Sequence, residues 1–156
     1  MPEACPNLVI QPSDVDEEYR NSVAEWTGDL PNVHKPIYLD AASPDSWEVA
    51  DESQDIVFNA NMIHITPFQC CEGLLAGTGK VLRPDGRFFL YGPFKIGGEF
   101  TSESNADFDK SLRSRDPSWG IRDAEEVERL AADAGMKLIA RESMPANNFT
   151  LVFEKR

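Results

Sequence analysis

The 156-residue chain has only three cysteines, Cys5, Cys70 and Cys71, and only two histidines, His34 and His64. An odd cysteine count that includes an adjacent pair is a poor disulfide framework and fits a reducing cytosol. The cysteines and histidines also lack the spacing of zinc ligands, so we expect no bound metal. We therefore predict a cytoplasmic protein, with the nucleus as a second location.

Long apolar runs are also absent. No stretch approaches the roughly 18–20 apolar residues that a membrane span requires, and residues 1–6 (MPEACP) have no basic region or apolar stretch typical of a signal peptide. We therefore expect no membrane partner. Hydrophobic residues still make up 41% of the chain, which predicts a packed core and a single domain over residues 1–156.

Basic residues are scarce in the first part of the chain. Residues 1–60 hold 13 acidic and 2 basic side chains, whereas residues 61–156 hold 14 and 13, and the formal net charge is −12. An acidic surface repels nucleic-acid phosphates, so we expect no nucleic-acid partner. The simplest role of this charge is solubility.

Strand-like and helix-like segments alternate, which predicts an α/β fold with a mainly parallel sheet. The strands are expected at residues 7–12, 36–40, 55–59, 87–91, 136–140 and 149–153. Residues 94–122 look irregular apart from a short helix near 104–115. Only a short connection separates the last two strands, so these should be antiparallel.

Capping residues predict where the main helices begin. Asp14 or Asp16 is expected to cap the first helix, and Asp123 the last. Thr66 followed by Pro67 predicts the start of a helix between them, with Thr66 as its cap.

Polar side chains follow three successive predicted strands, at Asp14, Asp40 and Asn59. In open parallel sheets, ligands bind outside the carboxyl ends of the strands. A carboxylate there can accept hydrogen bonds from both hydroxyls of a ribose or from an adenine amino group. The alternative is local: Asp14 caps its helix and Asp40 starts a turn.

Seven segments of the chain carry a resemblance to a known family. They are residues 11–16 (QPSDVD), 59–64 (NANMIH), 82–87 (LRPDGR), 91–94 (YGPF), 104–109 (SNADFD), 115–123 (RDPSWGIRD) and 144–148 (MPANN). Together they resemble the methyltransferase-like protein 26 family, which is assigned to the class I S-adenosylmethionine-dependent methyltransferases. The segments WGIRD and MPANN are the most specific, and the resemblance extends from residue 7 onward.

The resemblance implies a Rossmann-like class I methyltransferase sheet with helices on both faces and a C-terminal antiparallel hairpin. It implies that Asp14 contacts the ribose of S-adenosylmethionine and that Asp40 lies near the adenine. Asn59 would lie near the methionine part, and Asn61, with His64 and Tyr91, would face the site of methyl transfer.

The family's first strand and its Gly-x-Gly loop, which would precede Asn7, are missing from this sequence. Glycine lets the backbone approach the cofactor closely. We therefore expect an N-terminally truncated domain that binds S-adenosylmethionine weakly. Loss of a central strand would also leave buried backbone groups unpaired, at roughly 1–3 kcal/mol each. Either the sequence is truncated or the sheet is completed in another way.

The candidate catalytic residues are His64 and Tyr91. A neutral imidazole can act as a base near pH 7, although His64 could equally be a packing residue. Tyr91 could orient an acceptor or pack under the cofactor. The acceptor itself is not identified by the sequence.

Five basic residues in or beside the irregular region suggest an anionic acceptor: Lys95, Lys110, Arg113, Arg115 and Arg122. Ordinary pairing with Asp107, Asp109 and Asp116 is the alternative.

Two other functions are alternatives to methyl transfer. One is a non-catalytic interaction module or inactive isoform that keeps the same fold. A nicotinamide-dependent oxidoreductase is disfavoured, because the Gly-x-Gly-x-x-Gly segment that it needs is absent.

Overall fold

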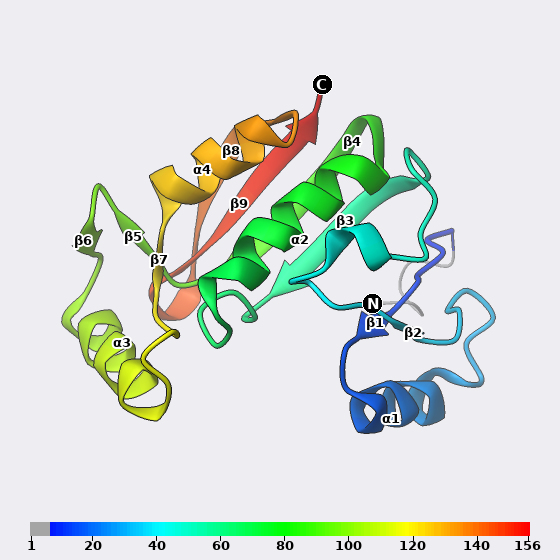
Figure 1. Cartoon of the computed structure of the whole chain (residues 1–156), viewed down its shortest axis with the longest axis horizontal. Coiled ribbons are helices and arrows are strands. Elements are labelled where there is room, and N and C mark those ends of the chain that lie inside the picture. The colour runs from blue at the N-terminus through cyan, green and yellow to red at the C-terminus, as the bar shows by residue number, and fades with distance from the viewer. Residues whose placement is uncertain (1–6) are drawn as a thin grey trace. The chain divides into compact units, whose positions relative to one another are not determined.

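The computed structural model describes residues 7–156 and contains two compact units, residues 7–48 and residues 49–156 (Figure 1). Cys5 and the rest of residues 1–6, which lack the features of a signal peptide, lie outside the described residues. The organisation of residues 1–156 as a single domain stays a prediction. Among residues 7–156, no helix is long and apolar enough to cross a membrane.

The first unit contains strand β1 (Ser13–Asp14), helix α1 (Glu17–Thr27), strand β2 (Ile37–Tyr38) and the 3-10 turn η1 (Pro44–Ser46). β1 and β2 are parallel, with Asp14 opposite Tyr38. Asp16 caps α1, because its carboxylate accepts hydrogen bonds from the backbone N–H groups of Glu18 and Tyr19.

The predicted strand at residues 7–12 is wrong in position. Before β1 only Ile10 forms a bridge, with Val33. Pro12 has no N–H to donate to a ladder, and Val9 is 64% exposed, whereas Leu8 and Ile10 are half-buried. The regular pairing begins only after Pro12, at Ser13.

The second unit is built on a four-stranded sheet of β3 (Gln54–Ala60), β4 (Leu82–Gly92), β9 (Asn148–Lys155) and β8 (Met136–Met144), in that order. β3 and β4 are parallel, whereas β9 is antiparallel to both β4 and β8. The prediction of a C-terminal antiparallel hairpin is therefore confirmed. β3 has β4 as its only strand partner within the described residues, so it forms one edge of this sheet.

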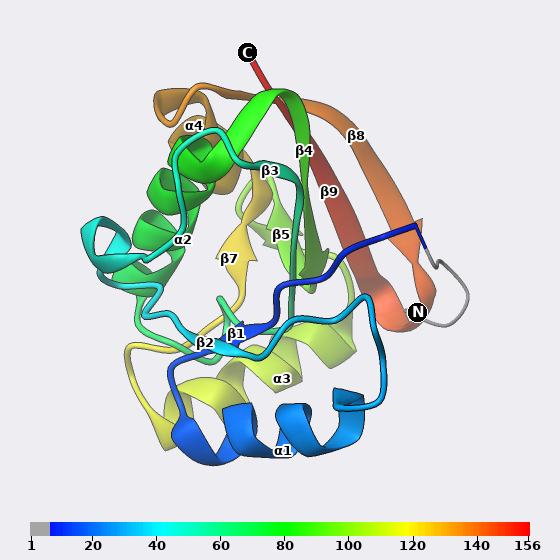
Figure 2. The ribbon, with the colours of Figure 1, turned by 90° about the vertical axis from the view of Figure 1, so that its right-hand side faces the viewer.

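Helices α2 (Phe68–Val81) and α4 (Ala124–Asp133) lie side by side on one face of this sheet (Figure 2). The strands turn apolar side chains towards them at alternate positions, and Phe88, Leu90, Leu151 and Phe153 are all fully buried. This face, with the helices that cover it, forms the hydrophobic core of the second unit.

The two helix caps predicted in this unit have different outcomes. Asp123 caps α4 as expected, accepting from the N–H groups of Glu125 and Glu126. Thr66 does not cap α2, and that prediction is wrong. Its hydroxyl donates instead to the carbonyl of Met62, four residues earlier, and Pro67 occupies the cap position.

The region expected to be irregular contains more structure than the sequence suggested. Helix α3 (Glu103–Arg115) is flanked by β5 (Phe94–Ile96), β6 (Glu99–Phe100) and β7 (Arg122–Asp123), which form a small third sheet in the order β6-β5-β7. Strands of two or three residues are too short to show an alternating pattern, so periodicity could not reveal them.

Candidate functional site

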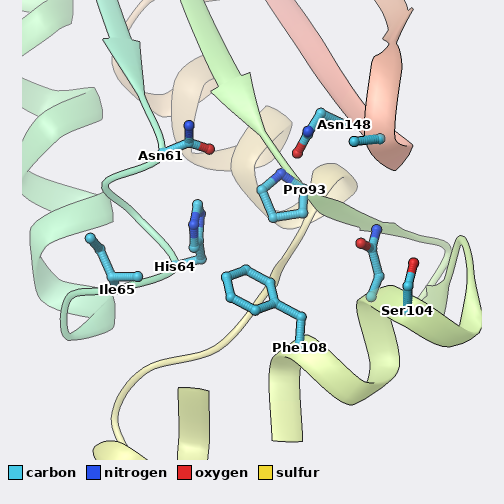
Figure 3. Close-up of a pocket in the computed structure, with 9 residues that line it drawn as sticks. Asn61, His64, Ile65, Pro93, Ser104, Phe108 and Asn148 are labelled. Atoms are coloured by element: carbon cyan, nitrogen blue, oxygen red, sulfur yellow. The ribbon is translucent and has the colours of Figure 1, made fainter. Parts of the chain in front are cut away.

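A pocket of about 490 Å³ lies in the second unit, beyond the carboxyl ends of the parallel strands β3 and β4 (Figure 3). Its lining comes from the segment after β3, from the residue that follows β4, from α3 and from the tip of the β8–β9 hairpin. The lining residues are Asn61, His64, Ile65, Pro93, Ser104, Asn105, Phe108, Ala146 and Asn148.

Asn61 is the first lining residue after β3, and its backbone is left-handed, with a φ of 55°. Asparagine tolerates this conformation better than most residues. The Asn61 N–H donates to the carbonyl of Tyr91 at 3.0 Å, which continues the pairing between β3 and β4 by one step. The chain then turns away from the sheet and brings His64 beside the pocket.

His64 is the one titratable group among the lining residues, and only 4% of it is exposed. Its ring meets the Phe108 ring edge-on, with the centroids 5.7 Å apart. Burial, followed by the positive charge of Arg122, lowers the pKa of His64 to about 4. Its imidazole is therefore neutral near pH 7. Its Nδ1 atom is enclosed without a hydrogen-bond partner, so a ligand would reach the ring at Nε2.

Arg122 holds the His64 segment in place through backbone carbonyls. Its guanidinium donates to the carbonyls of Ile63 (2.9 Å), Thr66 (2.6 Å) and Ser118 (3.1 Å), and it lies over the ring of Phe68. In the same segment, the N–H of Gly120 donates to the carbonyl of His64 at 3.0 Å. The motif WGIRD thus determines where His64 sits, a role that sequence reasoning missed.

Arg113 is also occupied within the protein. Its Nε donates to the buried carboxylate of Asp109 at 2.8 Å, and the other oxygen of that carboxylate accepts from the N–H of Ile121 at 2.7 Å. The Lys95 ammonium lies 4.5 Å from the centre of the Phe100 ring. None of the five basic residues proposed for an anionic acceptor is among the residues that line this pocket.

The tip of the β8–β9 hairpin forms the opposite wall and is tied to the start of α3. Ala146 and Asn147 are both left-handed, with φ values of 58° and 57°. The Asn105 side-chain amide donates to the carbonyl of Asn147 at 3.1 Å, and the amide of Asn147 donates to the Ser104 hydroxyl at 3.3 Å. This is the MPANN motif, so both specific segments of the sequence resemblance are found around one pocket.

The other predicted site residues of the second unit lie on the sheet itself. Asn59 pairs with Leu90, and its side-chain oxygen is buried without a partner. Tyr91 lies on β4 between Ala60 and Thr150 and is half-buried. The structure places His64 and Asn61 in the pocket but does not place Tyr91 among its lining residues. The catalytic role of Tyr91 stays a prediction.

In the first unit, Asp14 and Asp40 lie at the same end of a parallel strand pair, because Asp14 ends β1 and Asp40 follows β2 by two residues. One oxygen of Asp14 accepts from the N–H of Asp16 at 2.8 Å. Both oxygens of Asp40 are engaged, one by the N–H of Ala42 and one by the Ser43 hydroxyl. Asp14 is thus the carboxylate with an oxygen left for a ligand.

Residues 7–156 contain no cluster of three or more histidine, cysteine, aspartate or glutamate side chains placed to bind a metal ion. Cys71 is fully buried, and burial raises the pKa of its thiol to about 12. It is therefore a core residue, and it is not activated as a nucleophile.

Solved structures with the same fold include two proteins described as O-methyltransferases. An O-methyltransferase family protein from Burkholderia thailandensis superposes with a TM-score of 0.82 at 13% identity, over 99% of this chain and 46% of its own. A putative O-methyltransferase from Nostoc punctiforme gives 0.79 at 20% identity, over 99% and 47%. LepI in complex with S-adenosylmethionine gives 0.74 at 19% identity, over 99% and 39%.

The fold is thus the Rossmann-like fold of the class I methyltransferases, as the family resemblance implied. The chain spans less than half the length of these three proteins. A family profile matches residues 1–155, almost the whole chain. The protein therefore belongs to the family described as proteins of unknown function, DUF938.

Proposed function

We propose that this protein is an S-adenosylmethionine-dependent methyltransferase domain that transfers a methyl group to an acceptor in the pocket around His64. The observation that carries the proposal is a neutral, buried histidine beside a pocket at the carboxyl ends of two parallel strands. Open α/β folds bind their ligands at that edge of the sheet. A cytoplasmic or nuclear location belongs to the same proposal.

Two further observations support it. The fold is shared with LepI, whose structures contain S-adenosylmethionine or S-adenosylhomocysteine. The sequence segments that resemble the methyltransferase-like protein 26 family, including WGIRD and MPANN, lie around the pocket, where they position His64 and form a wall.

The residues fit the cofactor in each unit taken by itself. In the first unit, Asp14 has a carboxylate oxygen without a partner, which suits a ribose hydroxyl donor, and Asp40 lies at the same end of the strand pair. In the second unit, the buried, unpartnered side-chain oxygen of Asn59 suits an ammonium or amide donor, and Asn61 follows it. We assign the adenosyl part to the two aspartates and the methionine part to the two asparagines.

The chain's own contribution to the reaction is to bind, orient and exclude water. S-adenosylmethionine, when bound, supplies a methyl group that its sulfonium centre already activates. The pocket would hold the acceptor in one orientation, which is the main requirement for such a transfer. Nε2 of His64 would receive the acceptor's proton, because the ring is neutral at physiological pH.

Calorimetric titration of the chain with S-adenosylhomocysteine tests this function. Asp14→Asn keeps an oxygen for the Asp16 N–H but removes the charge, so affinity should fall about tenfold or more, the effect of losing one charged hydrogen bond. Asp29→Asn is the matched control, since Asp29 is exposed in a turn of the same unit. We expect its affinity to equal that of the unchanged chain.

A folded chain that shows no binding heat would contradict the proposal. It would favour the alternative function, a non-catalytic interaction module or inactive isoform. If affinity falls equally in Asp14→Asn and Asp29→Asn, the loss reflects the net charge of the chain. Asp14 would then not belong to the binding site.

A further inference from the structure

The pocket around His64 is polar but carries no charge. Its lining has three asparagines, a serine and a histidine that is neutral at pH 7, together with four apolar residues, and no lysine, arginine, aspartate or glutamate. An anion placed there would lose its hydration without meeting a cation, which is unfavourable. The nearby guanidinium of Arg113 is bound to Asp109, and that of Arg122 to backbone carbonyls.

One side of the pocket offers flat apolar surface that the protein itself does not cover. Phe108 is 39% exposed although its ring touches His64, and Ile65 is 41% exposed. Figure 3 shows Pro93 beside Phe108, whereas Ile65 lies on the other side of His64. Aromatic rings at such positions stack with other rings in offset or edge-on geometry. This side therefore suits a planar ring.

The polar side chains on the other side of the pocket already use some of their hydrogen-bonding groups within the protein. The Asn148 amide N–H donates to the carbonyl of Pro145, and the Asn105 amide to Thr101 and Asn147. Their side-chain oxygens, and the whole amide of Asn61, have no such partner among residues 7–156. These groups can accept from, or donate to, a hydroxyl or ring nitrogen of a bound ligand.

The Asn61 side chain and the His64 ring also face a common point. A Cβ built on Gly92 would stand 3.5 Å from Nδ1 of His64 and 3.8 Å from the side-chain oxygen of Asn61. Nδ1 of His64 makes no hydrogen bond within the protein. When the hydrogen of the neutral ring is on Nδ1, Nε2 is unprotonated and able to take a proton from a ligand.

From these contacts we infer that the acceptor is a neutral, planar aromatic or heteroaromatic molecule that carries a hydroxyl group, with its ring against Phe108 and its hydroxyl at Nε2 of His64. This inference rests on the proposed function. It names the class of acceptor, and it replaces the anionic acceptor that the basic residues had suggested.

Methyl transfer to this hydroxyl group requires no reactant besides the acceptor and S-adenosylmethionine. The hydroxyl oxygen forms a bond to the methyl carbon of the sulfonium cofactor, the carbon–sulfur bond breaks, and its electron pair stays on sulfur. The hydroxyl proton passes to Nε2 of His64 and from there to water. A hydroxyl hydrogen becomes far more acidic as its oxygen acquires the methyl group, so a weak base is sufficient to accept it.

Three bicyclic probes of similar size test the inference on the full chain: 2-naphthol, 2-naphthoate and decahydro-2-naphthol. They are, respectively, planar and neutral, planar and anionic, and non-planar and neutral. Binding is followed by NMR through the side-chain amide signals of Asn61, Asn105 and Asn148. We expect 2-naphthol to shift these signals and to bind at least about tenfold more tightly than either of the other probes.

Phe108→Leu should weaken 2-naphthol binding roughly three- to tenfold and leave the weaker binding of decahydro-2-naphthol unchanged. Phe100→Leu is the matched control, because Phe100 is 37% exposed but lies outside the pocket. We expect it to bind all three probes as the unchanged chain does.

If 2-naphthoate binds more tightly than 2-naphthol, the inference is overturned in favour of an anionic acceptor. If decahydro-2-naphthol binds as tightly as 2-naphthol, the acceptor does not need to be planar and the inference is overturned as well. No binding of any probe would show that the pocket takes another class of ligand. The S-adenosylhomocysteine titration remains a separate measurement. If the chain binds S-adenosylhomocysteine but none of the probes, the acceptor class alone is overturned. If it binds 2-naphthol but not S-adenosylhomocysteine, the proposed function is overturned and the pocket is a binding site for a planar ring without methyl transfer.

Discussion

The two compact units differ in what keeps them folded. Within residues 7–48 no residue is buried, whereas the second unit has a core of fully buried phenylalanine, leucine and methionine side chains. Both units nonetheless carry predicted site residues, at Asp14 and Asp40 in one and at Asn61 and His64 in the other. Predicted site residues thus occur both with and without a core beneath them. We expect the first unit to open locally more often than the second.

Chemically similar residues occur in both units, and they allow the comparison to be tested pair by pair. Each pair consists of one residue in the cored unit and a counterpart in the first unit. The difference within a pair isolates the effect of burial, because the chemistry of the two side chains is nearly the same.

The largest difference is expected for large aromatic residues. Phe153→Ala removes a fully buried side chain and should lower the free energy of unfolding by about 3–5 kcal/mol. Trp26→Ala removes a side chain that is 85% exposed and should change it by less than about 0.5 kcal/mol. Urea unfolding followed by circular dichroism measures both. A loss of several kcal/mol for Trp26→Ala would show that the Trp26 side chain is packed against other residues. It would contradict the expected difference between the two units.

A smaller difference is expected for two arginines that bind backbone carbonyls. Arg122 is 9% exposed and binds three carbonyls, whereas Arg20 is half-buried and binds those of Asp14 and Val15. Arg122→Gln should cost about 2–3 kcal/mol, and Arg20→Gln less than about 1 kcal/mol.

The arginine pair has a second measurement, the pKa of His64. The pKa of His64, followed by NMR, should rise towards its usual 6.5 in Arg122→Gln, because a nearby positive charge is removed. Arg20→Gln should leave it unchanged. If the His64 pKa falls or stays constant in Arg122→Gln, Arg122 does not act on the His64 ring.

At neutral pH the smallest difference concerns the two histidines, and it grows as the pH falls. The pKa of folded His64 is about 4, below its usual 6.5, so the unfolded chain takes up a proton in this range and the folded chain does not. The contribution of His64 to stability is complete above pH 6.5 and is lost as the pH falls to 4, by about 3 kcal/mol. His64→Gln should remove this part of the pH dependence, and His34→Gln, at an exposed site, should retain it. Identical pH profiles for the two variants would show that His64 is solvated.

Local signals predicted the features that depend on a few neighbouring residues. The cap at Asp123 needs only the N–H groups that follow it, and the antiparallel hairpin needs only a connection too short for a crossover. The same kind of signal failed at Thr66, because its hydroxyl had a competing acceptor, the carbonyl of Met62.

The site was only partly predictable for the same reason. His64 and Asn61 follow a recognisable strand, so their place at its end could be expected. The role of Arg122 depends on carbonyls more than fifty residues away in sequence, and no spacing along the chain indicates such a contact. Phe108 joins the pocket only because α3 packs beside the His64 segment, which the sequence does not reveal.

The left-handed backbone at position 61 limits how this family can vary in evolution. A β-branched or bulky residue is strained at that φ, while glycine, asparagine and aspartate are tolerated. Of these, glycine has no polar side chain and aspartate would bring a charge next to His64. Homologous sequences that keep the same chemistry should therefore retain asparagine at this position, and those with glycine there are the ones to examine for lost or altered function.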